Sequence, residues 1–189
     1  GGLVGEVVQI WKPKELNTFE TEWGFSCMGY EISGALGIKM AKPNQDVIVF
    51  VGDGSYLLNN SDIYSSVIYD KKLIIVVCDN GGHMVINRLQ LAKGGKEYLC
   101  NLKATGAKNL QFVDFESHAK SMGANAETVK STSELEAAFK RAKTSNKTYV
   151  ISIPEALLND LASFQNRLLT SFSSNEYIDW TSESAELVI

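Results

Sequence analysis

Two strings of sequence decide the fold, DVIVFVGDGS at residues 46–55 and LIIVVCDNGG at residues 73–82. Each begins with a continuous apolar run rich in β-branched residues, Asp46 to Val51 in the first string and Leu73 to Cys78 in the second. Such runs are too short for a core helix, so they predict strands that are buried on both faces. Each run is followed by a cluster of turn residues, which predicts that a loop begins there.

The segments around these two strands alternate between helical and strand character. Helices are expected over Met28 to Ala41, Asn60 to Tyr69, Asp114 to Met122 and after a capping box formed by Ser131 and Glu134. Further strands are expected over Glu127 to Val129 and Thr148 to Ile153. The alternation predicts an α/β fold, a doubly wound parallel sheet of about six strands with helices on both faces.

Two regions depart from this alternation. The stretch from His83 to Leu110 is polar, carries glycines and shows no clear period, which predicts a long loop of the kind that is often functional. A boundary is expected near Pro154. It divides the chain into a domain of residues 1–154 and a C-terminal part of residues 155–189, with an amphipathic segment from Leu157 to Leu169 before a serine-rich tail.

Composition and charge exclude several classes of protein. The chain has 189 residues, 44% of them hydrophobic and 21% charged, which excludes a disordered or collagen-like chain. The net charge of -4 comes without a basic stripe, so no nucleic-acid partner is expected. The apolar runs are about a third of the ~20 residues that a membrane-spanning helix needs, so no membrane partner is expected either.

The cysteines and the first residues suggest the context of the chain. Cys27, Cys78 and Cys100 lie far apart and lack the spacing of metal ligands, which predicts a reduced, cytoplasmic compartment. The chain opens at Gly1 without a methionine. We therefore interpret it as a piece of a longer protein.

Polar residues follow both decisive strands. In an open parallel sheet, ligands bind at the carboxyl ends of the strands, where Asp53 and Asn80 stand after their runs. Taken alone, either cluster is more often an ordinary turn than a binding site, and it is the pair at this spacing that favours a site. Together, Asp53, the Asn80 amide and a carbonyl near Gly82 form an all-oxygen site that suits Mg²⁺ or Ca²⁺, and Mg²⁺ with a diphosphate is favoured because the octahedron keeps room for phosphate oxygens and water.

At this spacing the two strings resemble the binding motif of thiamine diphosphate-dependent enzymes, which runs from Gly-Asp-Gly to a pair of asparagines. Asp79 stands in place of the first asparagine. The resemblance implies that Asp53, the Asn80 side chain and the Gly82 carbonyl hold Mg²⁺, and that Mg²⁺ holds the diphosphate of thiamine diphosphate.

The same resemblance extends to cofactor contacts outside the metal ligands. The string MGYEISGALG at residues 28–37 stands where acetolactate-synthase-like enzymes carry Met-Gly-Phe and Ala-Ile-Gly. It implies that Met28 bends the cofactor and that backbone near Ser26 and Met28 meets the aminopyrimidine. The cofactor-binding residues implied outside the metal ligands are Ser26, Met28, Gly52, Gly54 and Ser55.

Within this group the chain is most similar to the trihydroxycyclohexane-1,2-dione hydrolases of myo-inositol degradation. The strings WGFSCMGYEI at residues 23–32 and GDGSYL at residues 52–57 carry the similarity, which extends to residues 177–187. It implies hydrolytic cleavage of a carbon–carbon bond of a cyclic dione to 5-deoxyglucuronate. The chain departs from the pattern at Val4, where proline is usual, at His83, where an aromatic residue is common, and over residues 88–110.

The resemblance covers about the last third of that family's length. It implies that an N-terminal pyrimidine-binding domain and a middle domain lie outside this chain. The activating glutamate belongs to the pyrimidine-binding domain, so no catalytic residue is expected here and the chain alone is expected to be inactive. A homo-oligomer, a homodimer, is expected at full length, with the pyrimidine-binding domain supplied by the same or a partner chain.

Two other functions remain open at this point. One is an acetolactate-synthase-like carboligase or decarboxylase, and the other is a non-catalytic assembly module that retains the motif.

Several other residues carry side chains that can take part in chemistry. His83 adjoins the expected metal loop and is interpreted either as a general acid or base or as an exposed loop histidine. His118 is expected to be structural. Cys27 and Cys78 are expected to pack in apolar surroundings. Glu31 and Asp62 are expected to be helix-face or cofactor-supporting carboxylates.

Overall fold

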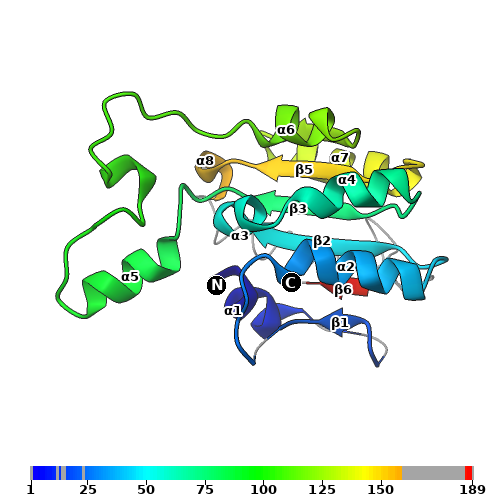
Figure 1. The fold of residues 1–189 in the computed structure, drawn as a ribbon, viewed down its shortest axis with the longest axis horizontal. Helices are drawn as coiled ribbons and strands as arrows, with labels where there is room; N and C mark the ends of the chain where they lie inside the picture. The colour runs from blue at the N-terminus through cyan, green and yellow to red at the C-terminus, as the bar shows by residue number, and fades with distance from the viewer. Residues whose placement is uncertain (1, 12, 14–15, 23, 159–185, 189) are drawn as a thin grey trace.

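The structure is a computed structural model that describes residues 2–11, 13, 16–22, 24–158 and 186–188. Its centre is a six-stranded sheet in the order β1-β6-β2-β3-β5-β4, in which every neighbouring pair is parallel (Figure 1). The strands are β1 (Phe19–Glu20), β2 (Val47–Gly52), β3 (Ile74–Cys78), β4 (Asn125–Thr128), β5 (Tyr149–Ile153) and β6 (Glu186–Val188). The predicted parallel α/β fold is confirmed.

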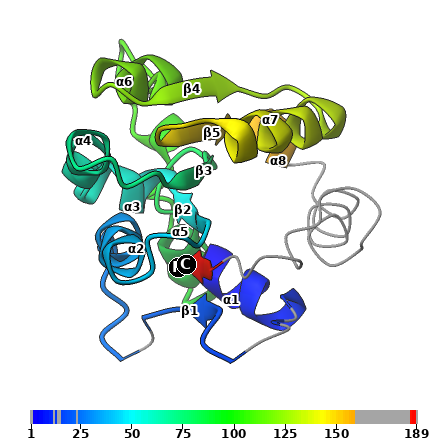
Figure 2. The same cartoon turned by 90° about the vertical axis from the view of Figure 1, so that its right-hand side faces the viewer.

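Helices cover both faces of this sheet (Figure 2). They are α1 (Gly2–Ile10), α2 (Tyr30–Ala41), α3 (Asp53–Leu58), α4 (Ser61–Ile68), α5 (Met84–Ala92), the 3-10 turn η1 (Leu102–Ala104), α6 (Phe115–Ser121), α7 (Thr132–Thr144) and α8 (Glu155–Leu158). Helices α1, α7 and α8 pack on one face, and α2, α3, α4 and α6 pack on the other. None of the described helices is long and apolar enough to cross a membrane.

The alternation of side chains along each strand creates two separate cores. In β2, Ile48 and Phe50 belong to the core under α1 and α7, whereas Val49 belongs to the core under α2 and α4. Successive side chains of a strand point to opposite faces, so a run without polar positions fills both cores. This is why the apolar runs before the two turn clusters form the centre of the sheet.

The predicted caps are formed in the structure. The Asp114 carboxylate accepts a hydrogen bond of 3.0 Å from the Ser117 amide and begins α6. The Ser131 hydroxyl accepts a hydrogen bond of 3.2 Å from the Glu134 amide and begins α7. The Glu134 carboxylate reaches back to the Lys130 amide at 2.7 Å, one residue before the cap residue.

Several predicted elements are corrected. The stretch from His83 to Leu110 is not all loop, since it contains α5 and η1. The turn at Asp53 is already the first turn of α3. Strand β4 begins at Asn125, two residues before the predicted start. Helix α1 and the short strands β1 and β6 were not predicted.

Only part of the predicted C-terminal region lies within the described residues. Helix α8 covers the start of the predicted amphipathic segment, and the rest of that segment lies outside the described residues. Strand β6 pairs with both β1 and β2, which brings residues 186–188 into the sheet. The division at residue 154 stays a prediction.

Candidate functional site

The two predicted polar loops meet at one edge of the sheet. Strands β2 and β3 are parallel neighbours, and Gly52 lies opposite Cys78 at their carboxyl ends. Asp53 and Asp79 therefore leave the sheet side by side. In Figure 1, α3 and α5 also lie beyond this edge, so the candidate site is bordered by elements that follow each strand directly.

Asp53 joins the two loops. Its side chain is buried, with 5% of the residue exposed, and its Oδ2 accepts a hydrogen bond of 2.7 Å from the Gly82 amide. Burial raises the pKa of Asp53 to about 6, while hydrogen bonds from Gly54 and Gly82 lower it and the nearby Asp79 carboxylate raises it further. Burial also raises the pKa of Asp79. Two neighbouring carboxylates, Asp53 buried and Asp79 half-buried, favour the presence of a cation.

Asn80 provides the test of whether a cation fits. Its side-chain Oδ1 is buried and accepts no hydrogen bond from any residue that the structure describes. An amide oxygen without a donor is the kind of ligand that Mg²⁺ or Ca²⁺ takes. Together with Asp53 and the Gly82 carbonyl, it forms the predicted oxygen set, and the chemistry of this set fits a hard divalent cation.

The backbone of the second loop depends on glycine. Gly81 and Gly82 have φ values of 81° and 134°, in the region that side chains disfavour. The Gly81 amide donates to Asp79 Oδ1 at 3.1 Å, and the Gly82 carbonyl accepts from the Met84 amide at 3.0 Å. These turns direct the chain from β3 back across the end of β2 and then into α5.

The His83 side chain lies against the first turn of α3. A Cβ atom at Gly54 would lie 2.6 Å from Cε1 and Nδ1 of His83, so the imidazole occupies the space beside this glycine. Ser55 follows in the same turn and is buried. Backbone amides in the first turn of a helix can bind a phosphate group. The resemblance implies that this turn meets the diphosphate, and the exposed His83 ring is the side chain that lies against it.

The upstream loop is held by two glutamates. Glu22 accepts hydrogen bonds from the Phe25 amide at 2.9 Å and the Cys27 amide at 2.7 Å. Glu31 accepts one from the Gly29 amide at 2.8 Å. These hydrogen bonds fix the conformation of the segment that carries Ser26 and Met28. Within it, Ser26 has a φ of 52°, in the left-handed region.

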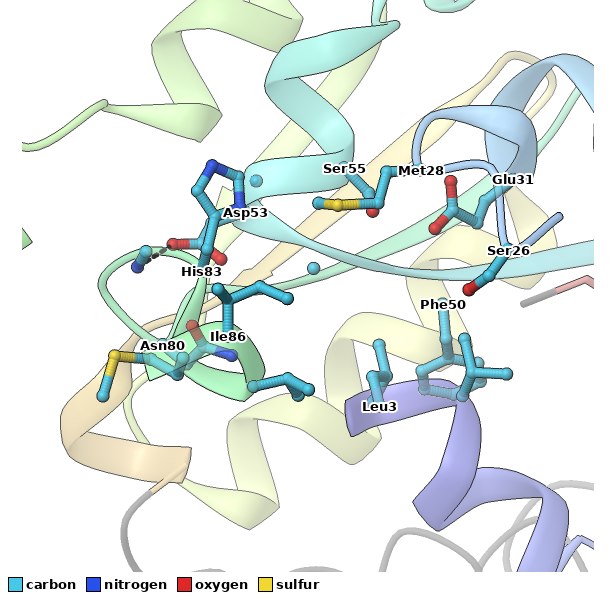
Figure 3. Close-up of a pocket in the computed structure, with 16 residues that line it drawn as sticks. Leu3, Ser26, Met28, Glu31, Phe50, Asp53, Ser55, Asn80, His83 and Ile86 are labelled. Carbon is cyan, nitrogen blue, oxygen red and sulfur yellow. Dashed lines mark hydrogen bonds between the residues drawn. The ribbon is translucent and has the colours of Figure 1, made fainter. Parts of the chain in front are cut away.

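One cavity of about 260 Å³ unites the two regions. All the predicted binding residues line it: Ser26, Met28, Gly52, Asp53, Gly54, Ser55, Asn80 and Gly82. Figure 3 shows Asp53, Asn80 and His83 at one end, Ser26 and Glu31 at the other, and the Met28 side chain reaching between them. Which of these residues bind a ligand stays a prediction, but the structure brings them into one space.

The cavity has further walls that the sequence did not reveal. They are Leu3 and Val4 of α1, Phe50 of β2, and Met84, Val85 and Ile86 of α5. The spacing of Ile86 and Leu89 in the string MVINRLQLA has helical character and was the available signal for α5. No comparable signal placed α1 beside the sheet edge.

The remaining candidates divide into those near the cavity and those away from it. Glu31 and His83 line the cavity, whereas Asp62 lies in the first turn of α4 and does not. His118 Nδ1 lies 2.9 Å from the buried Tyr56 hydroxyl, which agrees with a structural role. Cys78 is buried as predicted, but the prediction for Cys27 is wrong because this residue is exposed.

Comparison with known proteins gives a consistent result. Residues 1–153 match the family described as thiamine pyrophosphate enzyme, C-terminal TPP binding domain. The chain is 39% identical over 153 residues to a 3D-(3,5/4)-trihydroxycyclohexane-1,2-dione hydrolase of Halalkalibacterium halodurans, an alignment that covers 81% of this chain and 24% of the relative. Proteins of the same name from Listeria innocua and Bacillus subtilis are 35% and 32% identical, covering 99% and 98% of this chain and 30% of each relative.

Solved structures show the same fold. A thiamine diphosphate-dependent 4-hydroxybenzoylformate decarboxylase of Rhodococcus jostii RHA1 superposes with a TM-score of 0.59 at 22% identity, covering 67% of this chain and 23% of that one. A thiamin diphosphate-dependent enzyme of Mycobacterium smegmatis superposes with a TM-score of 0.51 at 24% identity, covering 68% and 22%. The chain spans 24% to 30% of the length of these curated relatives.

Proposed function

Because the chain belongs to the thiamine pyrophosphate enzymes, as their C-terminal TPP-binding domain, we propose that it binds the diphosphate and Mg²⁺ for a hydrolase of trihydroxycyclohexane-1,2-dione. The reaction is hydrolytic cleavage of a carbon–carbon bond that yields 5-deoxyglucuronate in myo-inositol degradation. The names of the relatives support this choice of substrate. The observation that carries the role of this chain is the buried Asn80 Oδ1, which accepts no hydrogen bond from the described residues and lines the same cavity as Asp53.

Three protein oxygens hold the cation in this proposal. Asp53 contributes a carboxylate, Asn80 an amide oxygen and Gly82 a main-chain carbonyl. Three ligands leave the other positions of an octahedron to diphosphate oxygens and water. Burial raises the pKa values of Asp53 and Asp79, and a bound cation would stabilise the ionised form of both carboxylates.

The other cavity residues orient the cofactor. Gly52, Gly54 and Ser55 present backbone and hydroxyl donors to the diphosphate. Met28 extends across the cavity and would be the side chain over which the cofactor bends, and backbone near Ser26 would meet its aminopyrimidine. The apolar wall from α1 and α5 excludes water from the reacting end.

The chemistry is divided between the cofactor, this chain and a second domain. Bound thiamine diphosphate supplies a nucleophilic carbon and accepts the electrons of the broken carbon–carbon bond. This chain binds and orients it, and a pyrimidine-binding domain of the same or a partner subunit supplies the activating glutamate. We place the complete enzyme in the cytoplasm as a homo-oligomer, with residues 155–189 as the C-terminal part that follows the binding domain.

Calorimetry on the full-length protein tests the binding role. We expect thiamine diphosphate to bind only with Mg²⁺ present, and Asn80→Ala to weaken this binding by about 100-fold or more, because a ligand of the cation is lost. Asn44→Ala is the matched control, since Asn44 is an exposed residue of the turn before β2. Metal-independent binding, or wild-type affinity in Asn80→Ala, would contradict the assignment.

Activity assays test the substrate. The full-length enzyme is expected to open the ring of the dione and to leave pyruvate unchanged. Pyruvate consumption without ring opening would instead identify a carboligase or decarboxylase. The absence of any metal-dependent binding heat in the wild type would identify an assembly module.

A further inference from the structure

A second segment crosses the loop that carries the proposed cation ligands. We call residues 79–83 the cation loop and residues 97–103 the bridging segment. Two main-chain hydrogen bonds join them, from the His83 amide to the Cys100 carbonyl at 2.8 Å and from the Leu102 amide to the Gly81 carbonyl at 3.0 Å. Between these bonds, Gly82 and Asn101 pair as an isolated antiparallel bridge. The position of the cation loop is therefore coupled to a segment outside the sheet.

The main chains of the cation loop and the bridging segment are in close contact at Gly82 and Cys100. A Cβ atom at Gly82 would collide with the Cys100 carbonyl oxygen. Within the bridging segment Leu99 has a φ of 56°, a conformation that a leucine adopts only when its surroundings impose it. The Cys100 amide donates to the Tyr98 carbonyl at 2.7 Å across Leu99, and side-chain contacts add to the main-chain bonds that hold the segment.

Glu97 makes those contacts. Its Oε1 accepts a hydrogen bond of 2.8 Å from Asn87 Nδ2 and another of 3.1 Å from Asn101 Nδ2. Asn87 belongs to α5 and is 2% exposed, while Asn101 is the residue that pairs with Gly82. The hydrogen bonds from Asn101 and Asn87 lower the pKa of Glu97, so both bonds favour the ionised carboxylate. One carboxylate thus ties the helix after the cation loop to the segment that crosses it.

The far end of the bridging segment is anchored as well. Lys103 Nζ lies 2.6 Å from Glu155 Oε2, at the start of α8. The Lys103 amide also donates to Asn101 Oδ1 at 3.1 Å. The segment is held at both ends, and Glu97 is the contact that faces α5.

We infer that Glu97 is a positioning residue for the divalent cation: through Asn87 and Asn101 it fixes the bridging segment on the cation loop and so sets the Gly82 carbonyl and the Asn80 side chain at the spacing that the cation requires. This inference rests on the proposed function. Glu97 touches neither the cation nor the diphosphate in this account. Its effect passes through the main-chain bonds of residues 81 and 83.

Two substitutions separate the contact from the charge. Glu97→Ala removes the acceptor of both hydrogen bonds, while Glu97→Gln keeps an oxygen acceptor and removes the charge. Glu136→Ala is the matched control, because it removes the same charge from α7 at a residue whose side chain makes no hydrogen bond or ion pair with the described residues. Glu97 is exposed, so each variant is expected to fold.

The test titrates Mg²⁺ into the full-length protein at saturating thiamine diphosphate and follows amide hydrogen exchange without ligand. Glu97→Ala is expected to weaken Mg²⁺ binding about tenfold or more, as removal of a group that orients a metal ligand does, and to speed exchange of the His83 and Leu102 amides. Glu97→Gln and Glu136→Ala are expected to stay within about twofold of the wild type.

The possible failures are distinct. Wild-type Mg²⁺ affinity in Glu97→Ala would overturn the inference, whether or not exchange changes. An equal loss in Glu97→Gln would also overturn it, because charge and not the paired contact would then matter. Absence of Mg²⁺ binding in the wild type itself would instead overturn the proposed function, and the exchange rates would still report whether Glu97 holds the loop.

Discussion

At the scale of single residues, Asp53 combines a cost in stability with a role in binding. Its pKa in the folded chain is about 6, above the ordinary value of 3.8, chiefly because it is buried. The ionised carboxylate of Asp53 is therefore less stable, relative to the protonated form, in the folded protein than in the unfolded chain. The stability that protonated Asp53 contributes is fully present below about pH 4 and is lost as the pH rises through 6.

This conflict predicts opposite effects of one substitution. Asp53→Asn is expected to stabilise the ligand-free protein at pH 7.5 by about 1–2 kcal/mol, since the buried charge is gone, and to abolish Mg²⁺-dependent cofactor binding. The gain in stability should shrink as the pH falls from 7 to 5. Urea unfolding at several pH values and calorimetry check both parts, and a less stable Asn variant at pH 7.5 would refute the first.

Proton competition predicts a second effect at the same residue. Mg²⁺ requires the ionised carboxylate, so the apparent affinity for Mg²⁺ is expected to fall below pH 6, approaching about tenfold per pH unit for one proton displaced. Titration of Mg²⁺ between pH 5 and 8 at saturating thiamine diphosphate measures the slope. An affinity that is constant across this range would exclude Asp53 as a ligand.

Substitution of Gly54 and of Gly82 by alanine is expected to change the stability of the protein by different amounts. In Gly54→Ala the new Cβ collides with the exposed His83 ring, which can swing away, and makes an ordinary contact with Met28 Cε at 3.4 Å, so stability should change by less than about 1 kcal/mol while cofactor affinity falls. In Gly82→Ala it meets the Cys100 main-chain carbonyl at a φ of 134°, so a loss of about 2–4 kcal/mol is expected. Thermal unfolding of both variants compares them, and equal losses would contradict this distinction.

At the scale of elements, the bridging segment contains conformational strain that can be relieved. Leu99 is 55% exposed with a φ of 56°, and asparagine tolerates this conformation better than leucine. Leu99→Asn is therefore expected to stabilise the protein by about 0.5–1 kcal/mol. The control is Leu91→Asn, at a residue of α5 that is 46% exposed, where a small loss is expected. Chemical denaturation distinguishes the two, and a loss in both would show that Leu99 is not strained.

Local sequence patterns predicted some of the helices and strands and missed others. The strand runs before Asp53 and Asp79 were predicted because buried β-branched runs and turn clusters are local signals. Helix α7 was predicted because its cap residues stand at fixed spacing. Helix α5 was missed although most of its residues are apolar, because Met84, Val85, Ile86, Leu89, Leu91 and Ala92 are spread around the helix and leave only a weak helical period.

At the scale of the whole molecule, the site lies between the two cores rather than inside either. The sheet fills both of its faces, and the ligand residues gather where the strands end. Residues of α1 and α5, two helices that lie far apart in the sequence, both line the cavity. Ligand binding is therefore expected to stabilise the folded protein as a whole.

Removal of the ligands tests this coupling. Thiamine diphosphate and Mg²⁺ together should stabilise the full-length protein by about 2.7 kcal/mol at one hundred times the dissociation constant. Either ligand alone should give little, because the cation links protein and diphosphate, and a chelator should reverse the effect. Thermal unfolding with each ligand, both ligands and both with a chelator measures it, and a full shift without Mg²⁺ would contradict the bridging role of the cation.

The sequence by itself determined the order of buried strands, the helices with clear caps and the proximity of Asp53 to Asn80, because parallel neighbouring strands end at one edge of a sheet. Only the tertiary structure decided that Leu3 and Val4 wall the cavity, that His83 lies against Gly54, and that Glu97 ties Asn87 to Asn101. Those contacts depend on the path of the chain between elements, and such a path results from packing over the whole molecule, which no local period or spacing encodes.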